Sequence, residues 1–310
     1  MASLAYIQIS RICNQNCLFC SNPANGKLIS FEKAKKIVDQ YAEEGYEGII
    51  WTGGEPTLYP RLAELIGYAS GRGLPSRVIT NGQKFADLSF LEELIGGGLK
   101  HIHLSLYSYK PKIQNYLSQN KDSFANIKKA LDNLKGAPVT VNINTAINKL
   151  NADHLSGTVG WILENYPAID HFVWNNLDPL MMKTPDRKLI PRLGDFEVEL
   201  WRSARLLKSR GKTFRIERVP LCYMDGFEEA STETRKIVKN EGRAVYFLDE
   251  KGFFKQTDWY EGGKSSRCSA CRLNGICNGL YEMGNFYDEE ELYPVFVEKE
   301  KIIRKILDEN

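Results

Sequence analysis

Short apolar runs alternate with amphipathic segments over most of this 310-residue chain, from Ala5 to about Ile216. This alternation is typical of strands separated by helices, so it predicts an α/β fold with a parallel sheet and right-handed crossovers, either doubly wound or curled toward a barrel. Strands are expected at residues 5–10, 48–52, 76–80, 101–105, 139–146 and 171–174. Helices are expected at residues 31–44, 62–71, 90–95, 123–134, 152–165 and 195–209, with Ser30 as the first N-cap.

The segments that follow the strands carry the chemistry. In both architectures, ligands bind at the carboxyl ends of the strands. The first strand leads into a cysteine loop, the second into TGGEPTLYP (52–60), the third into TNG (80–82) and the fourth into SLYSY (105–109). Paired glycines permit close backbone approach to a ligand, and Glu55 places a carboxylate beside them. We therefore expect these segments to form one functional face.

The cysteine loop holds Cys13, Cys17 and Cys20 in the pattern C-x3-C-x2-C. This spacing lets one short loop bind a single inorganic centre, and three thiolates leave one iron of a four-iron cluster open to an exogenous ligand. Zinc and chance clustering are the alternatives. Zinc usually takes four nitrogen or sulfur ligands, and no histidine lies in the first hundred residues.

A second group of cysteines lies near the other end of the chain. Cys268, Cys271 and Cys277 follow C-x2-C-x5-C, a metal-binding spacing, and Cys222 is the only cysteine left to complete four ligands. A structural zinc and an iron-sulfur cluster both suit such a set. A third interpretation leaves Cys222 free as a hydrogen-atom donor.

Composition narrows the cellular context. The N-terminus lacks a secretion signal and no apolar run is long enough to span a membrane, so we expect a cytoplasmic protein. In a reducing compartment, seven cysteines favour metal or redox chemistry over disulfides. The 41 basic and 39 acidic residues leave a net charge of +2, which gives no support for a nucleic-acid partner. We also expect a hairpin at 244–254 and a terminal helix whose apolar stripe is Val297, Ile302, Ile303 and Ile306.

The cysteine loop and the glycine pair together resemble the radical S-adenosylmethionine (SAM) enzymes, over residues 5–216. The resemblance implies a partial (β/α)6 barrel in which the three cysteines hold a 4Fe-4S cluster and SAM chelates the open iron. It also implies that the reduced cluster cleaves SAM to methionine and a 5′-deoxyadenosyl radical, which abstracts hydrogen from a substrate. An external electron donor of the flavodoxin or ferredoxin type is implied as well.

The resemblance also suggests which residues contact SAM, although it names no further catalytic residue. Phe19 matches an aromatic position that packs on the adenine, and Gly53 and Gly54 match the segment whose backbone meets the methionyl amine. A β-carbon at Gly54 is therefore expected to obstruct SAM more than it harms the fold. The remaining SAM-contact candidates are Glu55, Asn81, Ser105, Asn142 and Asn144. The aromatic residues interpreted as barrel packing are Trp51, Tyr107, Tyr109, Trp161 and Trp174.

The second cysteine group is similar to the SPASM and shorter twitch extensions of that family, which bind auxiliary 4Fe-4S clusters. Tyr281 stands where the longer pattern has a cysteine, and the thiols are too few for two auxiliary clusters. We therefore expect a radical SAM domain at 1–216 and a twitch-like module with one auxiliary cluster and the terminal helix at 217–310.

Three functions remain open at this stage. The first is maturation of a ribosomally made peptide by crosslinking, thioether formation or epimerisation, although the twelve residues before Cys13 argue against an N-terminal leader-binding module. The second is a small-molecule radical dehydrogenase or rearrangement enzyme. The third, from another class, is a non-catalytic iron-sulfur electron carrier.

Overall fold

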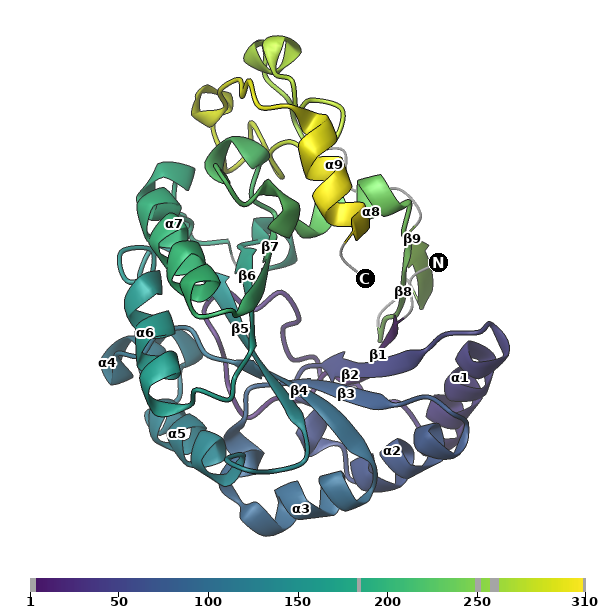
Figure 1. The fold of residues 1–310 in the computed structure, drawn as a ribbon. Coiled ribbons are helices and arrows are strands. Elements are labelled where there is room, and N and C mark those ends of the chain that lie inside the picture. Colours follow the sequence, from purple (N-terminus) through teal and green to yellow (C-terminus); the bar gives the residue numbers. More distant parts are fainter. Residues whose placement is uncertain (1–3, 183–184, 249–251, 257–261, 309–310) are drawn as a thin grey trace.

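A computed structural model describes residues 4–182, 185–248, 252–256 and 262–308. In these residues one sheet has the order β7-β6-β5-β4-β3-β2-β1-β8-β9, and it curls into a partial barrel (Figure 1). Strands β1 to β8 pair in parallel, and β9 pairs antiparallel with β8. The strands are β1 (Leu4–Ser10), β2 (Gly48–Gly53), β3 (Ser76–Thr80), β4 (Leu99–Ser105), β5 (Thr140–Ile147), β6 (His171–Asn176), β7 (Thr213–Glu217), β8 (Arg243–Tyr246) and β9 (Phe253–Gln256). The predicted parallel sheet, curled toward a barrel, is confirmed.

Helices cover the outer face of this sheet (Figure 1). They are α1 (Phe31–Glu43), α2 (Leu62–Gly71), α3 (Leu88–Gly96), α4 (Pro111–Ser118), α5 (Ser123–Asn133), α6 (Leu155–Asn165) and α7 (Leu193–Ser209). The side chain of Ser30 accepts a hydrogen bond from the backbone N–H of Lys33, so Ser30 is the N-cap of α1 as predicted. Because helices pack on the outer face of the sheet, that face is the apolar one.

Side chains on the strands divide between the two faces of the sheet. Ile7, Trp51, Val78, Ile102 and Ile143 are fully buried members of the main hydrophobic core. The neighbouring positions on the other face carry polar side chains, among them Gln8, His103, Asn142 and Asn144. Since successive residues of a strand point to opposite faces, the barrel has a polar interior beneath its carboxyl ends.

Several elements depart from the sequence-based prediction. Strand β7 and helices α4 and α8 (Thr232–Lys239) were not predicted. The expected hairpin at 244–254 corresponds to β8 and β9, but β8 also pairs with β1, which lies more than two hundred residues earlier. Local patterns specify a hairpin and not its distant partner. The division at 216 stays a prediction, and the sheet crosses that point.

Two helices lie between the separated strands β7 and β8 (Figure 1). Helix α8 packs on β7, and α9 (Lys299–Asp308) packs on α8. The predicted stripe of the last helix is confirmed for Ile302 and Ile306, which are buried, and for Ile303, which packs against the core. Val297 precedes α9 and is 39% exposed, so its assignment to the stripe was wrong.

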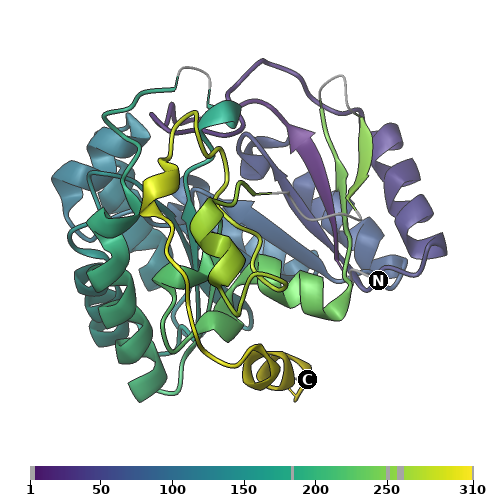
Figure 2. The ribbon, with the colours of Figure 1, turned by 90° about the horizontal axis from the view of Figure 1, so that it is seen from above.

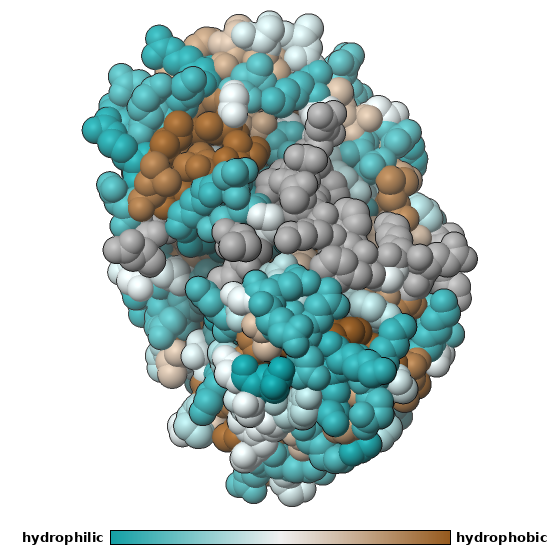
Figure 3. Space-filling model, turned by 90° about the vertical axis from the view of Figure 1, so that its right-hand side faces the viewer, coloured by the Kyte–Doolittle hydropathy of each residue, from teal (hydrophilic) through white to brown (hydrophobic). Residues whose placement is uncertain are grey.

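Seen from above, the C-terminal segment lies over the open side of the curled sheet, between α7 on one side and β1 on the other (Figure 2). The side of the molecule that carries α1, β8 and β9 is largely hydrophilic, and its largest hydrophobic patch lies at the upper left of Figure 3. No helix among the described residues has the length and apolar composition needed to span a bilayer.

Candidate cofactor sites

The loop after β1 carries the first three cysteines and is fixed to its surroundings by backbone hydrogen bonds. Arg11 N donates to Lys27 O at 2.8 Å, which closes the base of the loop. Leu18 N donates to Leu117 O at 3.0 Å, which ties the loop to the end of α4. Cys20 N donates to Cys17 O at 3.2 Å, so a tight turn brings these two cysteines to one side.

The thiols of this loop are close enough to affect one another. Burial, together with the neighbouring Cys20 and Cys13, raises the pKa of Cys17 to about 12. Burial likewise raises the pKa of Cys13 to about 11. Three thiolates in this setting need a positively charged partner, and an iron cluster supplies one. The donor set therefore fits the predicted cluster.

Two polar side chains from neighbouring strand ends contact these sulfurs. Asn81, after β3, donates through Nδ2 to Cys13 Sγ at 3.7 Å and to Asn14 Oδ1 at 2.7 Å. Tyr107, after β4, places its hydroxyl 3.9 Å from Cys17 Sγ. Sequence reasoning missed the second contact because it interpreted Tyr107 as packing. Its position in a segment just past a strand end was the available signal.

The glycine pair lies against the cysteine loop. Gly54 N donates to Ser10 O at 2.5 Å, and Glu55 N donates to Ile12 O at 2.8 Å. A β-carbon at Gly54 would overlap the carbonyl group of Ile12, because it would lie only 2.9 Å from the carbonyl carbon of that residue. Gly53 has φ +135°, a conformation that favours glycine, and its β-carbon would meet the Ser10 carbonyl. A β-carbon at Gly54 would therefore also disturb the backbone of the cysteine loop, while the expectation that it obstructs SAM more than it harms the fold stays a prediction.

The Glu55 carboxylate lies inside the protein and joins β2 to β3. Its Oε1 accepts hydrogen bonds from Thr57 N, Thr57 Oγ1 and Thr80 Oγ1 at 3.0, 2.6 and 2.7 Å. Its Oε2 accepts from Asn81 N at 2.7 Å. Burial raises the pKa of Glu55, and these donors oppose the rise. Glu55 thus holds Asn81 beside Cys13, while a direct contact of Glu55 with SAM stays a prediction.

The candidates on β4 and β5 share the inner face of the barrel. Ser105 pairs with Asn144 across the two strands, and His103 pairs with Asn142. Asn144 Oδ1 accepts from Asn175 Nδ2 at 2.6 Å, whereas Asn142 Oδ1 is buried without a hydrogen-bond partner among the described residues. A buried amide oxygen needs a donor, and the hydroxyl groups of SAM would supply one. This orphaned atom fits the predicted cofactor.

Phe19 is the buried aromatic residue of the cysteine loop. Its side chain is buried, and its ring meets that of Tyr107 edge to face with centroids 4.8 Å apart. The structure therefore brings Phe19 to the same strand end as Ser105. The contacts of Phe19, Ser105, Asn142 and Asn144 with SAM remain predictions.

Two histidines that sequence reasoning did not assign to a site also face the barrel interior. The rings of His101 and His103 stack with centroids 4.7 Å apart. Burial lowers the pKa of His101 to about 4 and that of His103 to about 3, and nearby Arg77 lowers both. Both imidazoles are therefore neutral near pH 7, with a buried Nε2 that has no partner among the described residues.

The second cysteine group converges on one cavity. Cys222 lies just after β7, and the other three cysteines come from residues 268–277. The cavity is lined by Pro220, Leu221, Cys222, Lys264, Cys268, Cys271, Asn274, Cys277, Gly279, Leu292 and Tyr293. Burial, together with the nearby Cys277 and Cys268, raises the pKa of Cys222 to about 12. Cysteines up to 55 residues apart in the sequence thus line one cavity, and their role as ligands of an auxiliary cluster stays a prediction.

Backbone groups hold two of these sulfurs. Gly279 N donates to Cys277 Sγ, and Val295 N donates to Cys271 Sγ, both at 3.3 Å. Such amide donors are typical of the surroundings of cluster sulfurs. Across the described part of the chain, no three His, Cys, Asp or Glu side chains are arranged to hold a single metal ion.

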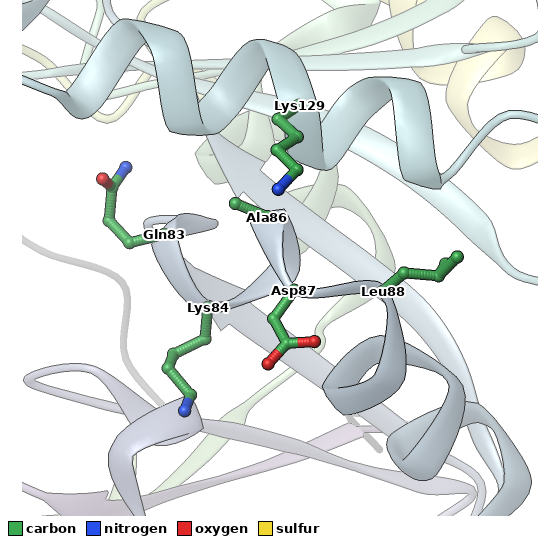
Figure 4. A pocket seen from close by; sticks show the side chains of 6 residues that line it. All are labelled: Gln83, Lys84, Ala86, Asp87, Leu88 and Lys129. Atoms are coloured by element: carbon green, nitrogen blue, oxygen red, sulfur yellow. The ribbon is translucent and has the colours of Figure 1, made fainter.

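A further depression lies between the turn that follows β3 and helix α5 (Figure 4). It is lined by Gln83, Lys84, Ala86, Asp87, Leu88 and Lys129, which come from the start of α3, the turn before it, and α5. The Lys84 and Lys129 side chains point to different sides of it (Figure 4). It contains none of the predicted cofactor residues.

Comparisons with known proteins agree with this geometry. Residues 7–162 match the family model of the Radical SAM superfamily. The PqqA peptide cyclase of Xanthomonas campestris pv. campestris (strain B100) is 28% identical over 164 residues, which are 51% of this chain and 43% of that protein. A 7,8-dihydro-6-hydroxymethylpterin dimethyltransferase of Methanocaldococcus jannaschii is 30% identical over 177 residues, 54% of this chain and 34% of that protein. The matched part thus spans less than half the length of either relative.

One solved structure resembles nearly the whole chain. Native anSMEcpe, with bound AdoMet and a Kp18Cys peptide, superposes with a TM-score of 0.67 and 16% identity over 98% of this chain and 96% of that one. At this identity the likeness shows the fold alone. The shared fold extends beyond the barrel to the C-terminal region that carries the second cysteine group.

Proposed function

The chain belongs to the radical SAM superfamily, and on this premise we propose that it is an enzyme that removes a hydrogen atom from a peptide substrate. The observation that carries the proposal is the set of three thiols after β1, which Asn81 and Tyr107 contact from the next strand ends. When bound, a reduced 4Fe-4S cluster and SAM supply a 5′-deoxyadenosyl radical as the hydrogen-abstracting agent.

The chain's own residues prepare this site. Cys13, Cys17 and Cys20 would hold three irons and leave the fourth for SAM. Gly53 and Gly54 let β2 end directly against the loop, so the cysteines stay at the mouth of the barrel. On the inner face, Asn142 Oδ1 would accept a hydrogen bond from a hydroxyl group of SAM, and Phe19 would pack on its adenine.

The four remaining cysteines would hold one auxiliary 4Fe-4S cluster. The support is their convergence on one cavity together with two backbone amides aimed at their sulfurs. Four thiolates satisfy all four irons, so this cluster would have no open position for SAM and would serve electron transfer. A structural zinc remains the competing occupant.

A peptide is the substrate class that the comparisons favour. One curated relative is named a peptide cyclase, and one neighbour in fold holds a peptide beside AdoMet. A small molecule is the second candidate, because another relative acts on a pterin according to its name. We further propose that the enzyme works in the cytoplasm, where its seven free cysteines stay reduced, and that a flavodoxin or ferredoxin donates the electron.

SAM cleavage tests the core of the proposal. Anaerobically reconstituted protein, with dithionite and SAM, should release 5′-deoxyadenosine and methionine. A variant with Cys13, Cys17 and Cys20 changed to alanine should release neither, while it keeps the iron of the C-terminal site. Wild type that binds iron and leaves SAM intact would identify an electron carrier and refute the enzyme.

The substrate class needs a second assay. Peptides encoded by short reading frames beside the gene are the natural probes, and mass spectrometry would detect the loss of hydrogen from the peptide. If a peptide increases the formation of 5′-deoxyadenosine and its own mass stays unchanged, the reaction is an epimerisation. Deuterium incorporation from the solvent into the peptide would reveal it.

A further inference from the structure

Tyr107 is the aromatic residue whose hydroxyl reaches the cysteine loop. It follows β4 by two positions, and its side chain is buried at 9% exposure. The hydroxyl lies 3.9 Å from Cys17 Sγ, within hydrogen-bond reach of a sulfur acceptor. A phenol has an ordinary pKa of about 10, so the hydroxyl carries its proton near neutral pH and can act as a donor.

The backbone of Tyr107 is held firmly in this position. Tyr107 N donates to Gln114 Oε1 at 2.8 Å, and Asn151 Nδ2 donates to Tyr107 O at 2.9 Å. The ring also packs edge to face on Phe19, one residue before Cys20. The hydroxyl therefore has little freedom to turn away from the loop.

The same buried network reaches the cysteine loop from a second direction. Gln114 Nε2 and Gln15 Nε2 both donate to Ser123 Oγ at 3.1 Å. Gln15 lies between Cys13 and Cys17, and its Oε1 is 3.5 Å from Cys17 Sγ. Tyr107 and the loop thus share one rigid set of partners, and the Tyr107 side chain also has Ser105 as a hydrogen-bond partner.

We propose that Tyr107 is a positioning residue that donates a hydrogen bond to the Cys17 sulfur and thereby raises the reduction potential of the N-terminal cluster. The inference rests on the proposed function only in taking Cys17 as a cluster ligand. Reduction adds negative charge to the cluster and its sulfurs, so a donor at a ligand sulfur stabilises the reduced state more than the oxidised one. Asn81 acts on Cys13 in the same sense from the adjacent strand end.

The variant Tyr107→Phe tests this, because it removes the hydroxyl and keeps the ring on Phe19. Tyr166→Phe is the matched control, since Tyr166 is also buried and loses one hydrogen bond, to Asp132, far from any cysteine. Both proteins are reconstituted anaerobically, and their iron content and thermal unfolding are compared with wild type. Redox titration of the N-terminal cluster is followed by electron paramagnetic resonance, in a Cys222→Ala background if the two cluster signals overlap.

The expected result is a midpoint potential shifted to more negative values in Tyr107→Phe and unchanged in Tyr166→Phe, at equal iron content. Electron-nuclear double resonance should also detect an exchangeable proton near the reduced wild-type cluster that is missing in Tyr107→Phe. If Tyr107→Phe loads iron poorly, the measurement is made in H₂O and D₂O on Asn81→Ala, which removes the exchangeable side-chain protons beside Cys13 and keeps the Tyr107 hydroxyl. An unchanged potential, or the absence of such a proton in wild type, overturns the inference and leaves SAM cleavage intact. Wild type that loads no cluster in the cysteine loop overturns both proposals.

Discussion

A β-carbon on Gly54 would overlap the carbonyl group of Ile12, because β2 ends directly against the cysteine loop. The loop that would hold the catalytic cluster is thus shaped in part by the glycine pair on the neighbouring strand. The backbone hydrogen bonds from Gly54 to Ser10 and from Glu55 to Ile12 seal the same contact. Substitutions in the glycine pair therefore act first on the loop.

Gly54→Ala should displace the cysteine loop and destabilise the protein by about 1–3 kcal/mol, the usual cost of overpacking. Iron bound at the N-terminal site and SAM affinity should fall together, as measured by iron analysis and equilibrium binding. Gly160→Ala is the control, because its β-carbon meets nothing within 4 Å and lies in α6, where alanine should stabilise by about 0.4–1 kcal/mol. Full iron content with a selective loss of SAM affinity in Gly54→Ala would contradict this account.

Glu55→Gln should weaken the link between β2 and β3. Both carboxylate oxygens of Glu55 accept hydrogen bonds, and in glutamine an NH₂ group, which cannot accept, replaces one of them. At least one buried hydrogen bond is therefore lost, which lowers the free energy of unfolding by about 1–3 kcal/mol. Denaturant unfolding measures the loss, and SAM cleavage should slow because Asn81 is no longer held beside Cys13. Glu92→Gln, at an exposed position of α3, should leave both readings unchanged. Wild-type stability in Glu55→Gln would show that the carboxylate is not needed for the loop.

Much of this arrangement could be predicted from the sequence, and the reason differs between its parts. Cys13, Cys17 and Cys20 lie within eight residues, so their spacing alone places them on one loop. The first six strands were found because each carries its own apolar run. The pairing of β8 with β1 and the contact of Tyr107 with Cys17 depend on distant segments, which no local pattern encodes.

The second cysteine site shows where such reasoning reaches furthest. Cys222 was grouped with Cys268, Cys271 and Cys277 only because no other cysteine remained, and the structure brings all four to one cavity. The predicted reason for the glycine pair was incomplete, because the sequence does not show that Ile12 folds back onto Gly54. Counting residue types thus grouped the four cysteines, whereas the contact between Ile12 and Gly54 depends on backbone geometry that a residue count does not encode.

Stability should fall as the pH is lowered below about 6.5, in part because of His103. Its pKa is about 3 in the folded protein and 6.5 ordinarily, so between these values the unfolded chain binds a proton that the folded chain excludes. The free energy of unfolding therefore decreases by up to about 1.4 kcal/mol per pH unit for such a group. His103→Gln should show a shallower slope between pH 6.5 and 5 in anaerobic urea unfolding. An identical slope in both proteins would mean that His103 takes up its proton without unfolding.

Cys222→Ala distinguishes the three interpretations of the C-terminal site, because its sulfur has a different task in each. If all four cysteines hold a 4Fe-4S cluster, wild type should contain about eight irons per chain and negligible zinc. The variant should then lose the auxiliary cluster, or shift its potential, and keep about four irons in the cysteine loop with normal 5′-deoxyadenosine formation. If Cys222 is a zinc ligand, its substitution should instead release zinc and loosen the module.

If Cys222 is a free hydrogen-atom donor, its substitution should leave every metal in place and stall the substrate after hydrogen abstraction. Wild type with one zinc and about four irons would refute the auxiliary cluster, and with it the proposed electron-transfer role of the C-terminal module.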